Sequence, residues 1–287
     1  MVEQRLEEPC VLGSSPRGAT TPNFKVKKIC EYANVFLLCL SAIVLLALQE
    51  TTLGYGILIV GLINLGFCGK EFRRNILLVY SAIALLGVTP FGTSIGLQHV
   101  TQMGFPLLLS VATPYLIAKY VYRNNLVSFP FNIHRIWRKK RIAYILFTLF
   151  LSYLILPFIL RGTNSYLNWI IEPGFWNILT SYIGLNAVAA WEELFFITVV
   201  LAILRRHLPF WQANIGQAIM FASFLFGVGW IGWSFVVIFA FALSQGYIYQ
   251  RTGSLAYVLA IHLSIDIFVH LSILELNHPG WVPIFIT

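Results

Sequence analysis

WEELFF, residues 191–196, places two adjacent carboxylates in the middle of an apolar run that extends from Trp176 to Leu204. A charged side chain at the centre of a bilayer costs roughly 2.5 to 3.5 kcal/mol, so Glu192 and Glu193 need a reason to lie there. We expect the pair to belong to a functional site. The alternative is a structural role, in which helix packing neutralises the two carboxylates or keeps them uncharged.

The composition of the 287-residue chain is that of a membrane protein. It is 58% hydrophobic and 10% charged, with a mean hydropathy of +0.78. A soluble domain does not need so much apolar surface, whereas a bundle of lipid-facing helices does. The formal net charge is +8, but the basic residues lie between apolar runs, where they report topology and contact anionic headgroups. We therefore expect membrane lipids as partners and exclude nucleic acid.

Nine apolar segments predict an all-α, polytopic integral membrane protein with about nine transmembrane helices. Most segments have the roughly 17 to 25 residues that a helix needs to cross the hydrocarbon core. The second and third are short, and the sixth is longer than one crossing requires. The segments are residues 32–48, 53–68, 75–91, 104–122, 142–160, 176–204, 213–230, 231–249 and 255–273.

These segments divide the chain into four regions. Residues 1–31 are polar and contain several glycines and prolines, so we expect a disordered cytoplasmic tail. Residues 32–175 are expected to form an N-terminal five-span transmembrane region. Residues 176–273 are expected to form a transmembrane core, and residues 274–287 a C-terminal tail.

The distribution of basic residues predicts a cytoplasmic N-terminus and a C-terminus on the opposite side of the membrane. With this orientation, eighteen of the nineteen Lys and Arg residues lie on the inside, and only Arg161 lies outside. A wrong number of spans would scramble this alternation. The longest inside connection, residues 129–141, is expected to be a loop, with a short interfacial helix as the alternative.

The last apolar segment carries two further polar groups, His262 and Asp266, spaced i, i+4 on one helix face. At 1.5 Å per residue, His262 lies about 12 Å and Asp266 and Glu192 about 18 Å from the inside ends of their segments. Their similar depth predicts a shared polar pocket between the sixth and ninth segments. Two carboxylates in a low-dielectric pocket cannot easily both ionise, which suits either general-base hydrolysis or a proton relay.

Four stretches in this region resemble motifs of the CPBP family, the group that contains CAAX prenyl endopeptidases and Abi-type bacteriocin-immunity proteins. The family pattern is EExxxR, then FxxxH, then HxxxN or HxxxD. The resemblance covers roughly residues 176–270, and the first five segments carry no motif. The stretches are EELFF (192–196), FLFG (224–227), QRTGSL (250–255) and IHLSID (261–266).

The resemblance implies a catalytic set of Glu192, Glu193, His262 and Asp266. Glu192 would activate a water with help from the histidine of FxxxH. His262 and Asp266 would stabilise the oxyanion that forms at the scissile carbonyl.

Two family positions are altered in this sequence. Ile197 stands where the family has the arginine of EExxxR, so Glu193 must pair elsewhere or stay protonated. Trp230 stands where the family has the histidine of FxxxH, and an indole supplies one N–H donor but no base. Because general-base catalysis contributes about 10²- to 10⁴-fold, these changes predict a severely weakened site.

The other histidines offer no obvious replacement. Four of them lie near segment ends or in loops, and His270 would join the site only if the last helix unwound. A zinc site of Glu192, Glu193 and His262 is a minor alternative, because HExxH is absent; we expect no metal and no other cofactor. The remaining histidines are His99, His134, His207 and His278.

The leading hypothesis is a divergent CPBP-family protein that is weakly active or inactive, a pseudoenzyme acting as a membrane scaffold or immunity factor. Its pocket would bind a membrane protein, a prenylated protein or a peptide. The first alternative is an active, glutamate-dependent intramembrane endopeptidase that cleaves CAAX-type peptides. The second is a proton-coupled transporter, although no inverted repeat is apparent.

Overall fold

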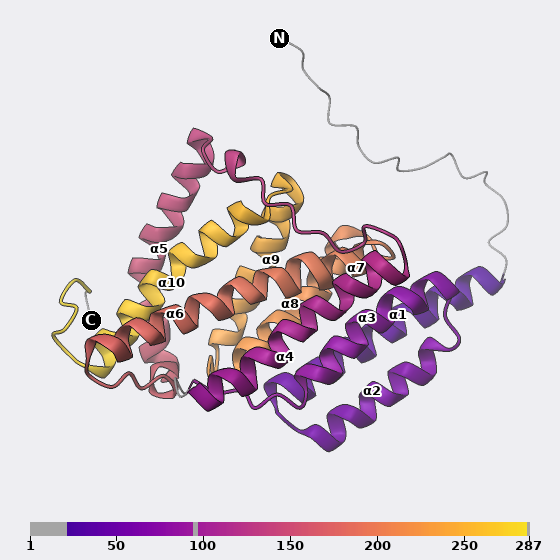
Figure 1. Cartoon of the computed structure of the whole chain (residues 1–287), viewed down its shortest axis with the longest axis horizontal. Coiled ribbons are helices and arrows are strands. Elements are labelled where there is room, and N and C mark those ends of the chain that lie inside the picture. The colour runs from indigo at the N-terminus through magenta and orange to yellow at the C-terminus, as the bar shows by residue number, and fades with distance from the viewer. Residues whose placement is uncertain (1–21, 94–96, 286–287) are drawn as a thin grey trace, which may run out of the picture.

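The structure, a computed structural model, describes residues 22–93 and 97–285 (Figure 1). Within these residues every secondary-structure element is a helix, which confirms the predicted helical membrane bundle. The N-terminal part contains α1 (Pro22–Ala42), the π-helix η1 (Ile43–Ala47), α2 (Thr51–Leu65), α3 (Lys70–Leu86), α4 (Leu97–Leu116) and the π-helix η2 (Ile117–Val121). The C-terminal part contains α5 (Lys139–Thr163), α6 (Phe175–Glu192), the π-helix η5 (Glu193–Leu201), α7 (Ala202–Arg205), α8 (Phe210–Gly227), α9 (Ser234–Thr252) and α10 (Leu255–Asn277), with short 3-10 turns η3 (Ile133–Arg135) and η4 (Ser165–Asn168).

Five helices in the described part of the chain are long and apolar enough to cross a membrane, so the chain is an integral membrane protein. Helix α2 is apolar but shorter. Helices α8 and α9 are not among the five, and polar side chains lie in the contact between them. Gln217 of α8 donates to the backbone oxygen of Ala242 on α9. The five spans are Lys27–Ala47, His99–Val121, Lys139–Thr163, Phe175–Arg205 and Leu255–Asn277.

The start of the first helix differs from the prediction. Helix α1 begins at Pro22 rather than near residue 32, so it includes the end of the region assigned to the tail. Proline suits the first helical position, because its missing N–H would be unbonded there in any case. An ion pair of 2.8 Å joins Lys28 and Glu31 one turn apart on this helix. The rest of the predicted tail, residues 1–21, lies outside the described residues.

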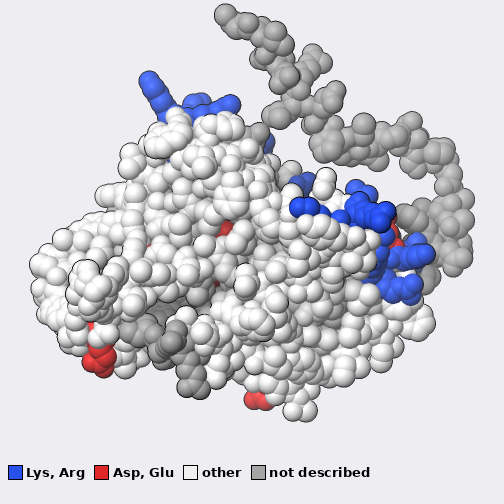
Figure 2. All heavy atoms as spheres, in the orientation of Figure 1, with Lys and Arg blue, Asp and Glu red and all other residues white. Residues whose placement is uncertain are grey.

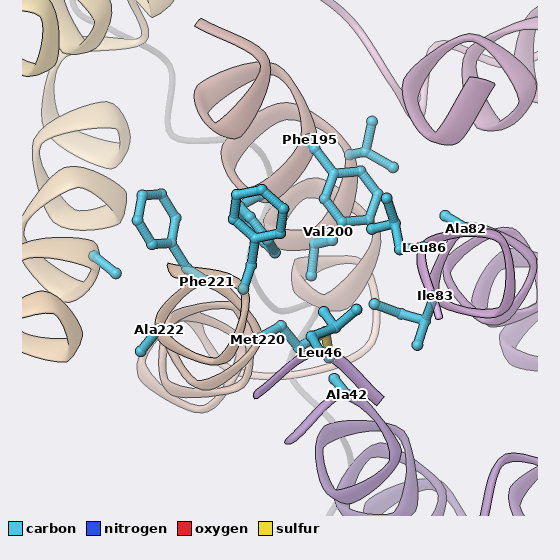
Figure 3. Packing of buried hydrophobic residues seen from close by; sticks show 14 of the residues in the cluster. Ala42, Leu46, Ala82, Ile83, Leu86, Phe195, Val200, Met220, Phe221 and Ala222 are labelled. Atoms are coloured by element: carbon cyan, nitrogen blue, oxygen red, sulfur yellow. The ribbon is translucent and has the colours of Figure 1, made fainter. Parts of the chain in front are cut away.

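The helix that carries the glutamate pair lies at the centre of the bundle. It runs without interruption through α6, η5 and α7, and η5 contacts α4, α8, α9 and α10 (Figure 1). In Figure 3, Phe195 and Val200 of η5 pack among residues of the neighbouring helices, including Leu86 of α3 and Phe221 of α8. These side chains are buried. Because lipid tails are as apolar as the side chains, close van der Waals packing rather than the hydrophobic effect holds such a core together in a membrane.

Charge is segregated on the surface. Figure 2 shows Lys and Arg gathered along the edge at which α1 and α5 begin and α7 ends, whereas acidic atoms mark the opposite edge. Residues 129–138, at the basic edge, form the expected loop with only the short turn η3, whereas residues 139–141 already belong to α5. The loop is held in place by Asn132, whose Nδ2 donates to Gly253 O at 3.0 Å and whose backbone oxygen accepts from Ser254 Oγ at 3.1 Å.

His207 is half-buried in the turn between α7 and α8. Its ring packs against Phe72, and its Nε2 lies 3.1 Å from Asn75 Nδ2, an amide nitrogen that can only donate. Burial lowers the pKa of His207 below its usual 6.5, although Glu71 and Glu31 act in the opposite direction. The folded protein therefore favours a neutral imidazole at this turn.

We expect this histidine to make stability depend on pH. Because the pKa of His207 is lowered in the folded protein, the unfolded chain binds more protons as pH falls through about 6.5. The free energy of unfolding therefore decreases over this range. His207→Gln keeps an acceptor for Asn75 but does not titrate, so it should flatten the dependence. Thermal unfolding of detergent-solubilised protein from pH 7.5 to 5.5 measures this, and equal slopes for the two proteins would contradict it.

Candidate active site

The four predicted catalytic side chains lie together where α6 and η5 meet α10. Glu192 ends α6 and Glu193 begins η5, while His262 and Asp266 are one turn apart on α10. All four side chains are buried. The shared pocket between the sixth and ninth helical segments is therefore present in the structure.

The imidazole of His262 lies among three carboxyl groups. Its Nδ1 is 2.8 Å from Glu193 Oε1, a hydrogen-bond distance. Its Nε2 is 3.6 Å from Glu192 Oε2 and 3.9 Å from Asp266 Oδ1. The carboxyls of Glu192 and Asp266 are thus too far from Nε2 for direct hydrogen bonds, but each is close enough for a water to bridge it to Nε2.

The π-helix explains how two consecutive glutamates can address one imidazole. In a regular α-helix, neighbouring side chains do not face each other. Here the wider π-helical turns begin at Glu193, directly after Glu192, and the two carboxyls meet opposite nitrogens of His262. Such π-helical stretches are rare and frequently occur at functional sites.

Aromatic rings enclose the other sides of His262. Phe241 of α9 meets the imidazole edge to face, with centroids 4.9 Å apart, and Phe221 of α8 lies at 6.1 Å. These apolar neighbours limit water near the ring, so charges and dipoles in the pocket interact more strongly than they would in bulk solvent.

The pocket opens into a cavity of about 1040 Å³ with mostly apolar walls. Glu192, His262 and Asp266 line this cavity, whereas Glu193 is not among its lining residues. The walls come from α4, α5, α6, α9 and α10. Several lining residues of α4, α5 and α6 are exposed, including Val100, Ile155 and Ile183. The cavity is therefore open along these three helices rather than enclosed.

The two altered family positions have different surroundings. Ile197 is fully buried in the hydrophobic core. Trp230 lies beyond the end of α8 in the cavity wall, where its ring packs edge to face against Trp169 at 5.4 Å. Positive φ angles at Gly229 and Gly232 form the turn that carries Trp230 away from the helix axis.

His270 belongs to the wall of the cavity rather than to the carboxyl–imidazole cluster. Helix α10 continues to Asn277, so His270 lies inside a helix and needs no unwinding to reach the cavity that it lines. Its Nε2 is 2.9 Å from Ser181 Oγ, and its ring packs against Tyr182. The spacing of His262, Asp266 and His270 at i, i+4 and i+8 is the signal that would have found it.

The sequence also did not predict a partner of Glu193, the side chain of Gln245. Glu193 Oε1 accepts a second hydrogen bond, of 3.1 Å, from Gln245 Nε2 of α9. Gln245 and His262 are therefore the partners of Glu193 Oε1 where position 197 offers no arginine, whereas Glu193 Oε2 has no partner within the described residues. No motif marked Gln245, because a buried glutamine in an apolar segment has many structural explanations.

The residues do not fit a metal site. In the described part of the chain, no group of three His, Cys, Asp or Glu side chains is arranged to hold a metal ion. The nearest candidate set, Glu192, Glu193 and His262, is instead joined internally, since His262 uses Nδ1 to contact Glu193.

Comparison with known proteins adds one finding. The family model described as type II CAAX prenyl endopeptidase Rce1-like matches residues 173–268, which are 96 of the 287 residues. The matched segment contains all four candidate catalytic residues and both altered positions. No curated protein matches this chain, and no solved structure does either.

Proposed function

Since the chain is a CPBP-family protein with a CAAX prenyl endopeptidase-like domain at residues 173–268, we propose that it is a weakly active intramembrane peptide hydrolase. The observation that carries this proposal is the carboxyl–imidazole cluster at the wall of a large apolar cavity. Glu192, His262 and Asp266 all line that cavity, so they are accessible to a substrate bound there.

In the proposed reaction, a water is held between Glu192 Oε2 and His262 Nε2. Glu192 accepts one proton as the water oxygen attacks the scissile carbonyl carbon. The other hydrogen of the water stays on its oxygen and donates a hydrogen bond to His262 Nε2, which aligns the water. When the C–N bond breaks, the proton on Glu192 passes to the leaving nitrogen. The products are a carboxylic acid and an amine, and Glu192 returns to its starting state.

Asp266 is assigned to the oxyanion. Its Oδ2 is buried and has no hydrogen-bond partner within the described residues. A protonated Asp266 donates from this oxygen to the negative charge that develops on the carbonyl, which is stronger stabilisation in an apolar site than in water. Glu193 does not touch the substrate in this arrangement and acts by orienting His262.

The cavity and the surface charge support the substrate class and the orientation. Mostly apolar walls suit a prenylated or otherwise apolar peptide, or a segment of a membrane protein.

The basic edge in Figure 2 supports a cytoplasmic N-terminus. Nine helical segments in the described part of the chain then support a C-terminus on the opposite side. Membrane lipids are the surrounding partner.

A second candidate, an inactive scaffold or immunity factor, is favoured by one observation. Trp230 occupies the position of the family's second proton-handling side chain, and its ring is packed against Trp169. An indole cannot accept a proton from water. If the cluster alone activates water too poorly, the cavity serves to bind a peptide or membrane protein without cleaving it.

Cleavage of a panel of fluorogenic prenylated peptides separates the two candidates. We expect slow turnover by wild type and about tenfold faster turnover by Trp230→His, below the roughly 10²- to 10⁴-fold of an optimised general base, because the new imidazole is not held by designed contacts. Trp233→His is the matched control, since this exposed tryptophan follows in the same turn. Peptide binding without turnover by wild type and Trp230→His would reject hydrolysis and favour the scaffold.

A further inference from the structure

Gln245 of α9 makes the contact from which this inference starts. Its side chain is fully buried, and its Nε2 lies 3.1 Å from Glu193 Oε1 and 3.5 Å from Val258 O. Both neighbours are oxygen acceptors, so the amide nitrogen, and not the amide oxygen, must face them. The direction of this hydrogen bond therefore follows from its surroundings.

The same carboxyl oxygen also meets His262. Two nitrogens, Gln245 Nε2 and His262 Nδ1, converge on Glu193 Oε1, while Glu193 Oε2 is buried without a partner within the part of the chain that the structure describes. An oxygen that already accepts from an amide N–H is placed to accept from the imidazole as well. This arrangement puts a hydrogen on Nδ1 of His262.

We infer that Gln245 is a positioning residue that holds Glu193 Oε1 toward His262 and thereby keeps the imidazole proton on Nδ1. The unprotonated Nε2 then faces Glu192 and Asp266 at the cavity wall. No residue of the family motifs performs this task here, since position 197 is an isoleucine within the core. The catalytic consequence rests on the proposed function, whereas the proton position does not.

The inference predicts a specific fault when the amide is removed. Without the second donor, the Glu193 carboxyl is free to rotate, and its Oε1 is no longer held where it accepts from Nδ1. The imidazole proton then resides on Nε2, where it occupies the nitrogen that would otherwise accept from water. A partner that sets a histidine tautomer in this way typically changes function by about 10- to 100-fold in metal sites, and we expect a similar range here.

The experiment uses the full-length protein in detergent with ¹⁵N-labelled histidine. Nitrogen chemical shifts distinguish the two neutral tautomers, and the His262 signals are identified by their loss in His262→Gln. Wild type should show the Nδ1–H form. Gln245→Met, which keeps the length and removes the donor, should show a shift toward the Nε2–H form. If this variant does not fold, Gln245→Asn shortens the reach of the amide and serves the same purpose.

Gln217→Met is the matched control. Gln217 is equally buried in the contact between α8 and α9, but it donates to Asn214 Oδ1 and Ala242 O and not to Glu193. The control should retain the wild-type tautomer, whereas the Gln245 variants should not. A wild-type tautomer in folded Gln245→Met and Gln245→Asn would overturn the inference, as would an Nε2–H form in wild type.

Peptide turnover by the same proteins separates the two proposals. If wild type turns over substrate, Gln245→Met should lower kcat by about 10- to 100-fold with little change in KM, because the donor acts through the imidazole and not through substrate contacts. An unchanged kcat beside a changed tautomer would overturn the catalytic part of the inference. A wild type without turnover, together with the expected change in tautomer, would reject the hydrolase and leave the role of Gln245 in place.

Discussion

Glu192→Gln is expected to lower kcat for peptide cleavage by about 10²- to 10⁴-fold, the range that general-base catalysis contributes. The substitution keeps the size of the side chain and its hydrogen-bonding capacity but removes the proton acceptor. Glu192 is buried at the cavity wall with its Oε2 3.6 Å from His262 Nε2, so no exposed carboxylate can take its place. KM should change little, because the base contributes to the transition state rather than to binding.

Product formation by wild type and variant is measured by chromatography and mass spectrometry of the cleaved peptide. Glu172→Gln provides the control, since this carboxylate is exposed just before α6 and outside the cavity lining. Its activity should equal that of wild type. Turnover by Glu192→Gln at the wild-type rate would show that Glu192 is not the base, and the carboxyl pair would then have the structural role considered at the outset.

Gly227→Ala is expected to destabilise the fold by about 1 to 3 kcal/mol or more, the usual cost of forced overpacking. A Cβ on Gly227 would overlap the backbone carbonyl oxygen of Leu46, at the point where α8 approaches η1. A backbone atom cannot rotate away as the end of a long side chain can. The same close approach allows Gln49 Nε2 to donate to Gly227 O at 3.2 Å, so this contact would also be disturbed.

Thermal unfolding in detergent tests this expectation against Gly56→Ala. No described atom lies within 4 Å of a Cβ placed on Gly56 of α2, and alanine is the better helix former by up to about 1 kcal/mol. The control should therefore unfold at or above the wild-type temperature, and Gly227→Ala well below it. Equal unfolding temperatures for the two variants would mean that α8 and η1 are farther apart than the structure places them.

Hydropathy predicted the helical segments, because a helix that contacts lipid or the core needs a predominantly apolar surface. The order and number of helical segments follow from it, as does the shared depth of Glu192, His262 and Asp266. The start at Pro22 was missed because charge and proline were both read as signs of disorder. One proline at a helix start carries no such meaning.

The rest of the site depends on contacts between segments far apart in the sequence. The π-helix at Glu193 has no signature in residue types, since its side chains are as apolar as those of the flanking α-helix. Gln245 can be recognised as a site residue only from its contact with the Glu193 carboxyl on a different helix. His270 was not expected at the cavity although it lies on the same helix face as His262 and Asp266, because the motifs do not show how far the cavity extends along α10.

The opening of the cavity among α4, α5 and α6 means that lipid chains compete with any substrate for the same space. Lipid tails are as apolar as the cavity wall, so an apolar substrate gains almost nothing from the hydrophobic effect when it leaves the bilayer for the cavity. The free energy that distinguishes a ligand from the surrounding lipid must then come from its polar atoms. In this protein the polar atoms of a ligand would contact Glu192, His262 and Asp266. The side chains proposed for chemistry would therefore also determine which ligand binds in preference to lipid.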